Sequence, residues 1–274
     1  MRTVLYFVLV LAGAYVAITA LAYAFQQQLV FFPSSTMATD PGAAGLAYEE
    51  VSIDTEDGET LHNWWIPAEE AVGTVVFFHG NAGNISGRVG TANFFHEHDM
   101  NVLLVSYRGY GRSTGSPSED GLYRDAEAAW QYLTEERGVA SESILIAGRS
   151  LGSAPATYLA SRTAPGGLLL ESAFTSLPDV GARAYPILPV RWLSRFEFDN
   201  EARIGQVNAP VLMIHSPNDE VVPYDLGRTL YAAASEPKTF VDIQGGHNAM
   251  RTDQSAYRQA VRTFIDEHWP TSNE

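Results

Sequence analysis

Ser150, at the centre of Gly148-Arg149-Ser150-Leu151-Gly152, is the side chain whose surroundings most clearly suggest chemistry. The apolar run Ile144-Leu145-Ile146-Ala147 precedes this motif, and small or apolar residues from 153 to 160 follow it. This order predicts a strand, a sharp turn and a helix, with the serine at the turn. Such a turn lifts a hydroxyl clear of the sheet, and the start of the helix points backbone N–H groups at the space beside it. We therefore interpret Ser150 as a candidate nucleophile.

A serine hydroxyl is a weak nucleophile and needs an adjacent base. The candidate base is His247, in Gly245-Gly246-His247-Asn248, directly after the last predicted strand. A loop in this position lies at the carboxyl edge of an open α/β sheet, where ligands bind. The alternative is an ordinary surface-loop histidine.

The base in turn needs an acid that fixes its tautomer and stabilises the imidazolium. Asp219 follows the predicted strand at 210–215, and the chain order Ser150, Asp219, His247 is one in which hydrolytic triads occur. Glu220 is adjacent, but its side chain is expected to point elsewhere. Glu171 ends the preceding strand and is the alternative acid, unless it is a buried structural carboxylate that orders the neighbouring loops.

An oxyanion that forms at this serine requires backbone donors. One is expected to be the N–H of Leu151, the residue after the nucleophile. The other is expected from the glycine-rich loop His79-Gly80-Asn81-Ala82-Gly83-Asn84, with Asn81 as the best candidate. His79 itself is interpreted as a structural hydrogen-bonding residue.

The pattern of apolar runs predicts how these residues are positioned. Residues 48–54 and 60–66 flank the turn Glu56-Asp57-Gly58 and predict an antiparallel hairpin. Strands and helices then alternate, which predicts a mostly parallel, doubly wound α/β sheet covered on both faces. The strands are expected at 74–78, 101–106, 143–147, 167–170, 210–215 and 239–243, and the helices at 86–98, 120–137, 151–162, 224–234 and 255–268.

A segment rich in proline and aromatic residues, at about 174–204, interrupts this alternation. It predicts a small helical insertion. Such a segment can form a lid over a pocket, and the alternative is a packed connection without a gating role.

The first residues predict a membrane segment. From Val4 to Phe25 the sequence carries no charge, and a run of ~20 apolar residues spans a bilayer core. Ala22-Tyr23-Ala24 resembles a signal-peptide cleavage site, but the run exceeds the usual ~7–15 apolar residues of such peptides, which favours an uncleaved anchor. Arg2 and the amino terminus are positive, so we expect the following domain to face outside the cytoplasm. Residues 1–25 are thus predicted as the anchor (or a signal peptide), 26–45 as a linker and 46–274 as the folded domain.

Composition excludes several classes of function. The chain has 274 residues, with 17 basic and 32 acidic side chains and a net charge of −15, which argues against a nucleic-acid partner. It has no cysteine, so disulfides, thiolate metal sites and cysteine nucleophiles are excluded. No cluster of residues has zinc-ligand spacing, and no metal or cofactor is expected.

The sequence resembles the α/β-hydrolase superfamily, and within it the membrane-anchored serine hydrolases that include the alpha/beta hydrolase domain-containing proteins 13 and 17. The resemblance runs from about residue 26 to 270. The motifs that carry it are Leu29-Val30-Phe31-Phe32-Pro33, His79-Gly80-Asn81-Ala82-Gly83-Asn84, Tyr107-Arg108-Gly109-Tyr110-Gly111, Ser116-Pro117-Ser118-Glu119-Asp120-Gly121-Leu122, Gly148-Arg149-Ser150-Leu151-Gly152-Ser153, Glu171-Ser172-Ala173-Phe174-Thr175-Ser176, Asp219-Glu220-Val221-Val222-Pro223 and Gly246-His247.

This resemblance implies the α/β-hydrolase fold, a single N-terminal anchor, and Ser150, Asp219 and His247 as nucleophile, acid and base. The sequence departs from the family at His215-Ser216, where His-Gly is common. The type 17 proteins are depalmitoylases with an N-terminal cysteine cluster that this sequence lacks, so that activity is not transferred.

We therefore expect a serine hydrolase that cleaves small or lipid-like acyl esters through an acyl-enzyme. An amide or peptide substrate on the same residues is the nearer alternative, and a non-catalytic anchored interaction module is the more distant one. The oligomeric state and the acyl chain length do not follow from the sequence.

Overall fold

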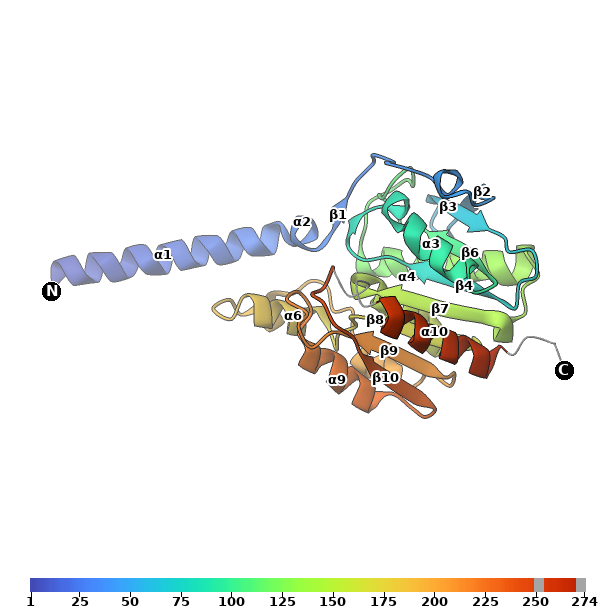
Figure 1. Ribbon diagram of the computed structural model, residues 1–274. Coiled ribbons are helices and arrows are strands. Elements are labelled where there is room, and N and C mark those ends of the chain that lie inside the picture. The colour runs from blue at the N-terminus through green and yellow to red at the C-terminus, as the bar shows by residue number, and fades with distance from the viewer. Residues whose placement is uncertain (249–253, 270–274) are drawn as a thin grey trace.

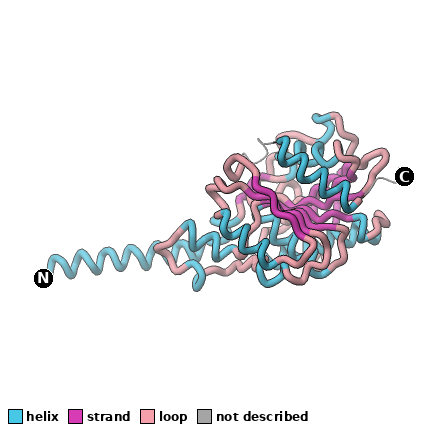
Figure 2. The backbone as a smooth tube through the Cα atoms, turned by 60° about the horizontal axis from the view of Figure 1, so that its bottom comes forward, coloured by secondary structure: helices cyan, strands magenta, loops and turns pink. Residues whose placement is uncertain are grey.

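The computed structural model describes residues 1–248 and 254–269. A central sheet lies between helices, and a long N-terminal helix, α1 (Arg2–Ala24), projects away from them (Figure 1). Figure 2 shows the twisted strands at the centre of the molecule with helices on both sides. The predicted α/β class, doubly wound arrangement and antiparallel start are confirmed.

Among the residues that the structure describes, the main sheet has eight strands in the order β10-β9-β8-β7-β4-β6-β3-β2. The hairpin strand β2 is antiparallel to β3, β3 is antiparallel to β6, and the remaining neighbours are parallel. The strands are β2 (Glu49–Asp54), β3 (Thr60–Ile66), β4 (Gly73–Phe78), β6 (Met100–Val105), β7 (Ile144–Arg149), β8 (Gly167–Glu171), β9 (Val211–His215) and β10 (Lys238–Asp242).

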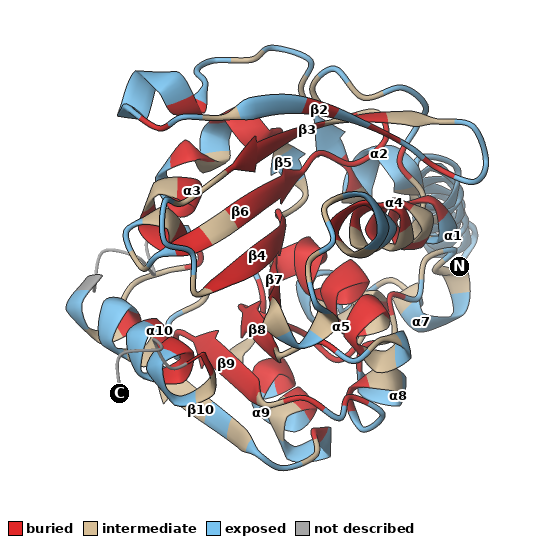
Figure 3. Ribbon diagram, turned by 90° about the vertical axis from the view of Figure 1, so that its right-hand side faces the viewer, coloured by how far each residue is buried: buried red, intermediate tan, exposed pale blue. Residues whose placement is uncertain are grey.

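Two apolar layers bury the faces of this sheet. Helices α3 (Val89–His96) and α10 (Gln254–His268) cover one face, whereas α4 (Glu119–Gln131), α5 (Ser153–Arg162) and α9 (Tyr224–Ala233) cover the other (Figure 3). Side chains of β4 alternate between the layers, with Val75 and Phe77 in one and Val76 and Phe78 in the other. Burial on both faces explains why the parallel strands are continuous apolar runs.

The carboxyl ends of the parallel strands align at one edge. Phe78 of β4 lies opposite Gly148 of β7, Arg149 opposite Glu171, and His215 opposite Asp242. Residues that follow these strands are therefore brought together, although they lie far apart in the sequence. This is the edge at which open α/β sheets bind ligands.

The turn from β7 to α5 depends on two glycines. A Cβ added to Gly148 would lie 2.3 Å from the carbonyl oxygen of Gly152, and one added to Gly152 would lie 2.1 Å from the carbonyl oxygen of Phe78. Between them, Ser150 has φ +52°, in the left-handed region that a residue with a side chain rarely adopts. Close approach of α5 to β4 therefore holds a strained serine at the end of the strand.

A buried ion pair fastens the hairpin to the helical layer. The Arg108 guanidinium donates to Asp125 of α4 (2.8 Å) and to Asp57 in the β2–β3 turn (2.7 Å). The Asp125 side chain is fully buried, and Arg108 is 6% exposed. The hydrogen bond from Arg108 is the main reason that the pKa of Asp57 lies well below its ordinary value.

Residues 26–45, predicted as a linker, pack against the domain. They contain α2 (Gln26–Val30) and the short strand β1 (Phe32–Pro33), which pairs with β5 (Ala82–Gly83). Phe31 is buried, and the Asn84 side chain donates to the carbonyls of Ser34 and Thr36. Composition could not show this, because the contacts join segments about fifty residues apart. The division into anchor (1–25) and domain (46–274) stays a prediction.

The predicted insertion at 174–204 forms three short helices: α6 (Leu177–Ala184), α7 (Val190–Leu193) and α8 (Glu201–Ile204). Figure 1 shows that α6 and its following loop project on the side of the sheet from which α1 extends. Helix α6 and its following loop thus lie beside the carboxyl edge, whereas α8 packs with α5 and α9, and its Ile204 belongs to their apolar layer.

We predict that Gly152→Ala lowers the free energy of unfolding by roughly 1–3 kcal/mol, because the added methyl group must displace backbone. The control is Gly87→Ala, where nothing lies within 4 Å of an added Cβ and φ is not positive; a change within about 0.5 kcal/mol is expected there. Urea unfolding of the detergent-solubilised chain measures both. Equal midpoints for the two variants would contradict the packing argument.

Candidate active site

The imidazole of His247 contacts the carboxylate of Asp219. His247 Nδ1 lies 2.8 Å from Asp219 Oδ2 and 3.0 Å from Oδ1. The Asp219 side chain is fully buried, and that of His247 is 8% exposed. The loops after β9 and β10 supply the two residues, and the parallel pairing of these strands brings the loops together. A carboxylate at Nδ1 leaves Nε2 available as the proton acceptor.

Both oxygens of the buried Asp219 carboxylate accept hydrogen bonds. Oδ2 accepts a hydrogen bond from the Ser172 hydroxyl (2.7 Å), and Oδ1 accepts from the backbone N–H groups of Val221 and Val222 (2.9 and 2.8 Å). Nε2 of His215 lies 3.4 Å from Oδ2. Burial alone would raise the pKa of Asp219, but the hydrogen bonds from His215, His247 and Ser172 hold this pKa well below its ordinary value.

The two alternative carboxylates take other partners. Glu171 accepts from the Tyr257 hydroxyl (2.6 Å) and lies 3.9 Å from Nε of Arg149. Glu220 accepts from the backbone N–H of His247 (2.8 Å). Both therefore contribute to the frame around His247, while Asp219 is the carboxylate in contact with its ring.

The loop that carries His247 is held from several sides. Nη2 of Arg149 donates to the carbonyl of His247 (2.7 Å). The Ser216 hydroxyl donates to the carbonyl of Gly245, so the serine found where the family often has glycine joins the two loops. These contacts hold the backbone on both sides of the imidazole.

Ser150 opens onto a mostly apolar cavity of about 580 Å³, in the size range of small-molecule sites. Leu151 and Asn81, the two residues expected to supply oxyanion donors, line the same cavity. The structure thus brings Ser150, Leu151 and Asn81 to one space, at the sheet edge that also carries Asp219 and His247.

Tyrosines fix the loop that contains Asn81. The Tyr110 hydroxyl donates to the carbonyl of Asn81 and the Tyr107 hydroxyl to that of His79, each at 2.8 Å. His79 is fully buried, its Nδ1 lies 2.6 Å from the carbonyl oxygen of Gly80, and burial lowers its pKa to about 3. A neutral, buried imidazole outside the cavity lining agrees with its interpretation as a structural residue.

Ser172 and His215 are the site residues that sequence reasoning did not assign. Both stand at strand ends: Ser172 directly follows β8 and has φ +47°, and His215 ends β9. Their positions in the sequence could have indicated them, because residues at or just after the strand ends of this edge are expected to surround Asp219. Their contact with Asp219 requires the folded chain.

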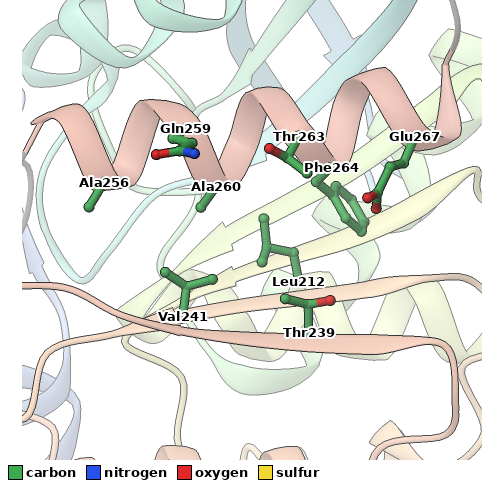
Figure 4. A pocket seen from close by; sticks show the side chains of 9 residues that line it. All are labelled: Leu212, Thr239, Val241, Ala256, Gln259, Ala260, Thr263, Phe264 and Glu267. Atoms are coloured by element: carbon green, nitrogen blue, oxygen red, sulfur yellow. The ribbon is translucent and has the colours of Figure 1, made fainter.

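A second pocket, of about 370 Å³, lies between α10 and strands β9 and β10 (Figure 4). Leu212, Val241 and Phe264 give it an apolar floor, and Glu267 is the titratable group among the described residues that line it. It contains neither a histidine nor an elbow serine, so it does not compete with the Ser150 cavity as the place of reaction. Within residues 1–248 and 254–269, no group of three or more potential ligands could hold a metal ion.

Family comparisons cover most of the domain. A family model described as serine aminopeptidase, S33, matches residues 69–197. A second, described as TAP-like protein, matches residues 193–271. Together they extend from before β4 to beyond α10.

Relatives from bacteria, plants and fungi match along nearly the whole chain. An uncharacterized protein of Mycobacterium tuberculosis is 39% identical, with 88% of each chain covered. The alpha/beta hydrolase domain-containing protein WAV2 of Arabidopsis thaliana is 34% identical over 85% of this chain and 84% of its own. An uncharacterized membrane protein of Saccharomyces cerevisiae is 33% identical over 93% and 95%, respectively.

Solved structures share the fold. An esterase from Pyrococcus furiosus superposes with a TM-score of 0.74 at 18% identity, over 88% of this chain and 98% of its own. The order of the strands, the site at the strand ends and the relatives that match over most of their length all indicate one family. The chain belongs to the α/β-hydrolase superfamily.

Proposed function

We propose that this protein is a serine hydrolase that cleaves carboxylic acyl esters, with Ser150 as nucleophile, His247 as general base and Asp219 as the acid. The observation that carries the proposal is the buried contact of Asp219 with Nδ1 of His247, at the sheet edge where the strained Ser150 opens onto an apolar cavity. The carboxylate at Nδ1 is the partner that a general base requires, and it supports the proposed role of His247.

In the proposed reaction, the Ser150 oxygen attacks the acyl carbon while Nε2 of His247 accepts the hydroxyl proton. The tetrahedral intermediate collapses, the C–O bond to the alcohol breaks, and the imidazolium donates its proton to the leaving oxygen. A water molecule then attacks the acyl-enzyme, again giving its proton to His247. The bond between the acyl carbon and the Ser150 oxygen then breaks, His247 returns its proton to that oxygen, and release of the carboxylic acid leaves the free serine.

The backbone N–H groups of Leu151 and Asn81 are proposed to stabilise the oxyanion. Loss of one such donor typically costs about 3 kcal/mol of transition-state stabilisation. The tyrosine hydrogen bonds to the carbonyls of His79 and Asn81 support this role, because they keep the loop in one orientation before substrate binds.

Asp219 is proposed to stay ionised throughout and to stabilise the imidazolium. The lowered pKa of this buried carboxylate supports the role, as do its hydrogen bonds from Ser172, Val221 and Val222. Ser172 and His215 are assigned as positioning residues, since they contact Asp219 rather than the reacting atoms.

A second candidate substrate class is an amide or peptide. The family model that matches residues 69–197 is described as a serine aminopeptidase, which favours it. The ester proposal ranks first because the cavity beside Ser150 is mostly apolar and the structural neighbours include esterases.

We predict that the purified, folded chain reacts covalently with a fluorophosphonate probe and that Ser150→Ala abolishes labelling. The oxygen of a serine that an adjacent base activates attacks the phosphorus of the probe and displaces fluoride, which leaves a phosphonylated serine. Gel fluorescence measures the reaction, and Ser153→Ala, which changes a buried serine in α5, is the control that keeps labelling. A folded wild-type chain that does not label would exclude the catalytic proposal and favour the non-catalytic alternative.

We predict that Asp219→Asn lowers kcat for p-nitrophenyl butyrate by about 10⁴-fold, because an amide cannot hold the imidazole in the required tautomer. Glu171→Gln keeps an acceptor for the Tyr257 hydroxyl. Its kcat should stay within about tenfold of the wild-type value, because Glu171 shapes the surroundings of the site and does not contact the His247 ring. Steady-state hydrolysis rates test both. A larger loss in Glu171→Gln than in Asp219→Asn would reverse the assignment of the acid.

We further propose that α1 anchors the chain in a membrane with the hydrolase domain outside the cytoplasm. An 18-residue stretch of α1 has a mean hydropathy of 2.4, no residue of the helix is fully buried, and a yeast relative is described as a membrane protein. The amino terminus and Arg2 are both positively charged, which favours retention of this end of α1 in the cytoplasm.

This orientation predicts that alkaline phosphatase fused to the carboxyl terminus is active in a bacterial host, because the enzyme folds only after export to an oxidising compartment. The matched fusion to a variant lacking residues 1–25 should be inactive. Equal activity of the two fusions, or a silent full-length fusion, would contradict the proposed orientation.

A further inference from the structure

The C-terminal half of the N-terminal helix forms part of the cavity wall beside Ser150. Thr19 and Ala22 of α1, and Gln26 and Val30 of α2, line that cavity. These residues are half-buried, and their spacing of three to four places them on one face of the helical segment. The opposite face of α1 is exposed along its length.

The insertion forms the facing wall and is hydrogen-bonded to this helical segment. The Tyr15 hydroxyl donates to the carbonyl of Ile187 (3.0 Å), and the Gln26 side chain donates to the carbonyl of Leu193 (2.6 Å) and accepts from the N–H of Arg195 (2.8 Å). The cavity between them therefore has one wall from the insertion and another from α1, and Ser150, which is almost fully buried, lines the same cavity.

These contacts determine how deep the insertion lies if α1 spans a bilayer. Tyr15 precedes Ala24 by nine residues, which is about 14 Å along a helix axis. The hydrocarbon core is about 30 Å thick. We call residues 185–193 of the insertion, which include the Tyr15 partner Ile187, the tip. The tip therefore lies inside the outer half of this core, together with the apolar cavity beside it.

The exposed side chains of the tip suit that environment. Tyr185, Ile187 and Trp192 are 55%, 78% and 92% exposed in the protein alone. Such a concentration of exposed apolar groups marks a contact surface. The nearby Arg191 is paired with Asp179 at 2.8 Å. The adjoining apolar helix identifies lipid as the environment that covers these side chains.

We propose that this cavity is an acyl channel that opens sideways into the bilayer between α1 and the insertion, and that the substrates are esters whose long acyl chain resides in the membrane. This inference rests on the proposed hydrolase function and adds the substrate class and its route. The scissile carbonyl meets Ser150, and the acyl chain follows the α1 wall.

The physical advantage is that the chain never crosses water. Transfer of an acyl chain from bilayer to water is disfavoured by about fourfold in the equilibrium constant for each methylene group. A channel that joins the hydrocarbon core to Ser150 avoids this transfer. The carboxylic acid produced at Ser150 returns to the membrane by the same route, whereas a polar alcohol leaves toward the aqueous side.

The test compares two tryptophan substitutions on opposite faces of α1. Ala22 lines the channel, whereas Ala20 is exposed and lies about 200° round the helix. The full chain is reconstituted in phosphatidylcholine vesicles, with p-nitrophenyl palmitate incorporated in the same vesicles or p-nitrophenyl butyrate added in solution. The measured quantity is the ratio of the palmitate rate to the butyrate rate.

Ala22→Trp is expected to lower this ratio by about tenfold or more, since loss of favourable burial for two methylene groups already amounts to about tenfold. Ala20→Trp should keep the wild-type ratio. Identical ratios in both variants, with wild type active on both esters, would overturn the channel while leaving the hydrolase proposal intact. A wild type inactive on both esters and unlabelled by fluorophosphonate would instead count against the hydrolase proposal.

A second measurement tests the depth of the tip without using activity. Because the chain has no cysteine, a nitroxide can be attached at one introduced cysteine, Ile187→Cys. The control position is Glu70→Cys, an exposed site before β4 at the sheet edge opposite Ser150. In vesicles, the label at 187 should collide more with oxygen than with an aqueous nickel chelate, and the label at 70 should show the reverse. Equal nickel accessibility at the two positions would overturn the lateral opening.

Discussion

The close approach of the β7–α5 turn to strand β4 is the constraint on which the site depends. Gly152 lies so near the carbonyl of Phe78 that a Cβ at this position would overlap it, and Gly148 lies as near to Gly152. Packing this tight leaves the intervening Ser150 in a left-handed conformation. Sheet packing, rather than any local preference of serine, thus presents this hydroxyl to the cavity.

A second constraint is the buried charge of Asp219. A carboxylate removed from water is unfavourable unless its oxygens receive hydrogen bonds. Here Ser172, His247 and two backbone N–H groups of the same loop supply them. Three strand ends contribute to this arrangement, so the sheet register sets the electrostatics as well as the geometry.

The N-terminal segment forms part of the wall of the cavity beside Ser150. Residues between 18 and 30 line one side of the cavity and the insertion lines another, and hydrogen bonds from Tyr15 and Gln26 join the two. Apolar length alone indicated a membrane segment, and it said nothing about a wall beside Ser150. The two features belong together because the same hydrogen bonds that hold the insertion also hold the helix.

Local patterns were sufficient for the strands of the main sheet, the helices that cover it and the hairpin, because apolar periodicity reports which faces are buried and is visible in consecutive residues. The motif at 148–152 identified Ser150 for the same reason: its glycines and flanking runs are contiguous. Local patterns did not predict α2, β1 or β5. Composition also determined the absence of thiol chemistry. The choice among Asp219, Glu171 and Glu220 as partner of His247 was different, since all three stand near strand ends and only their directions distinguish them. Those directions, the contacts of Ser172 and His215, and the docking of residues 26–45 were decided by the tertiary structure, because they join side chains that meet only when the strands align.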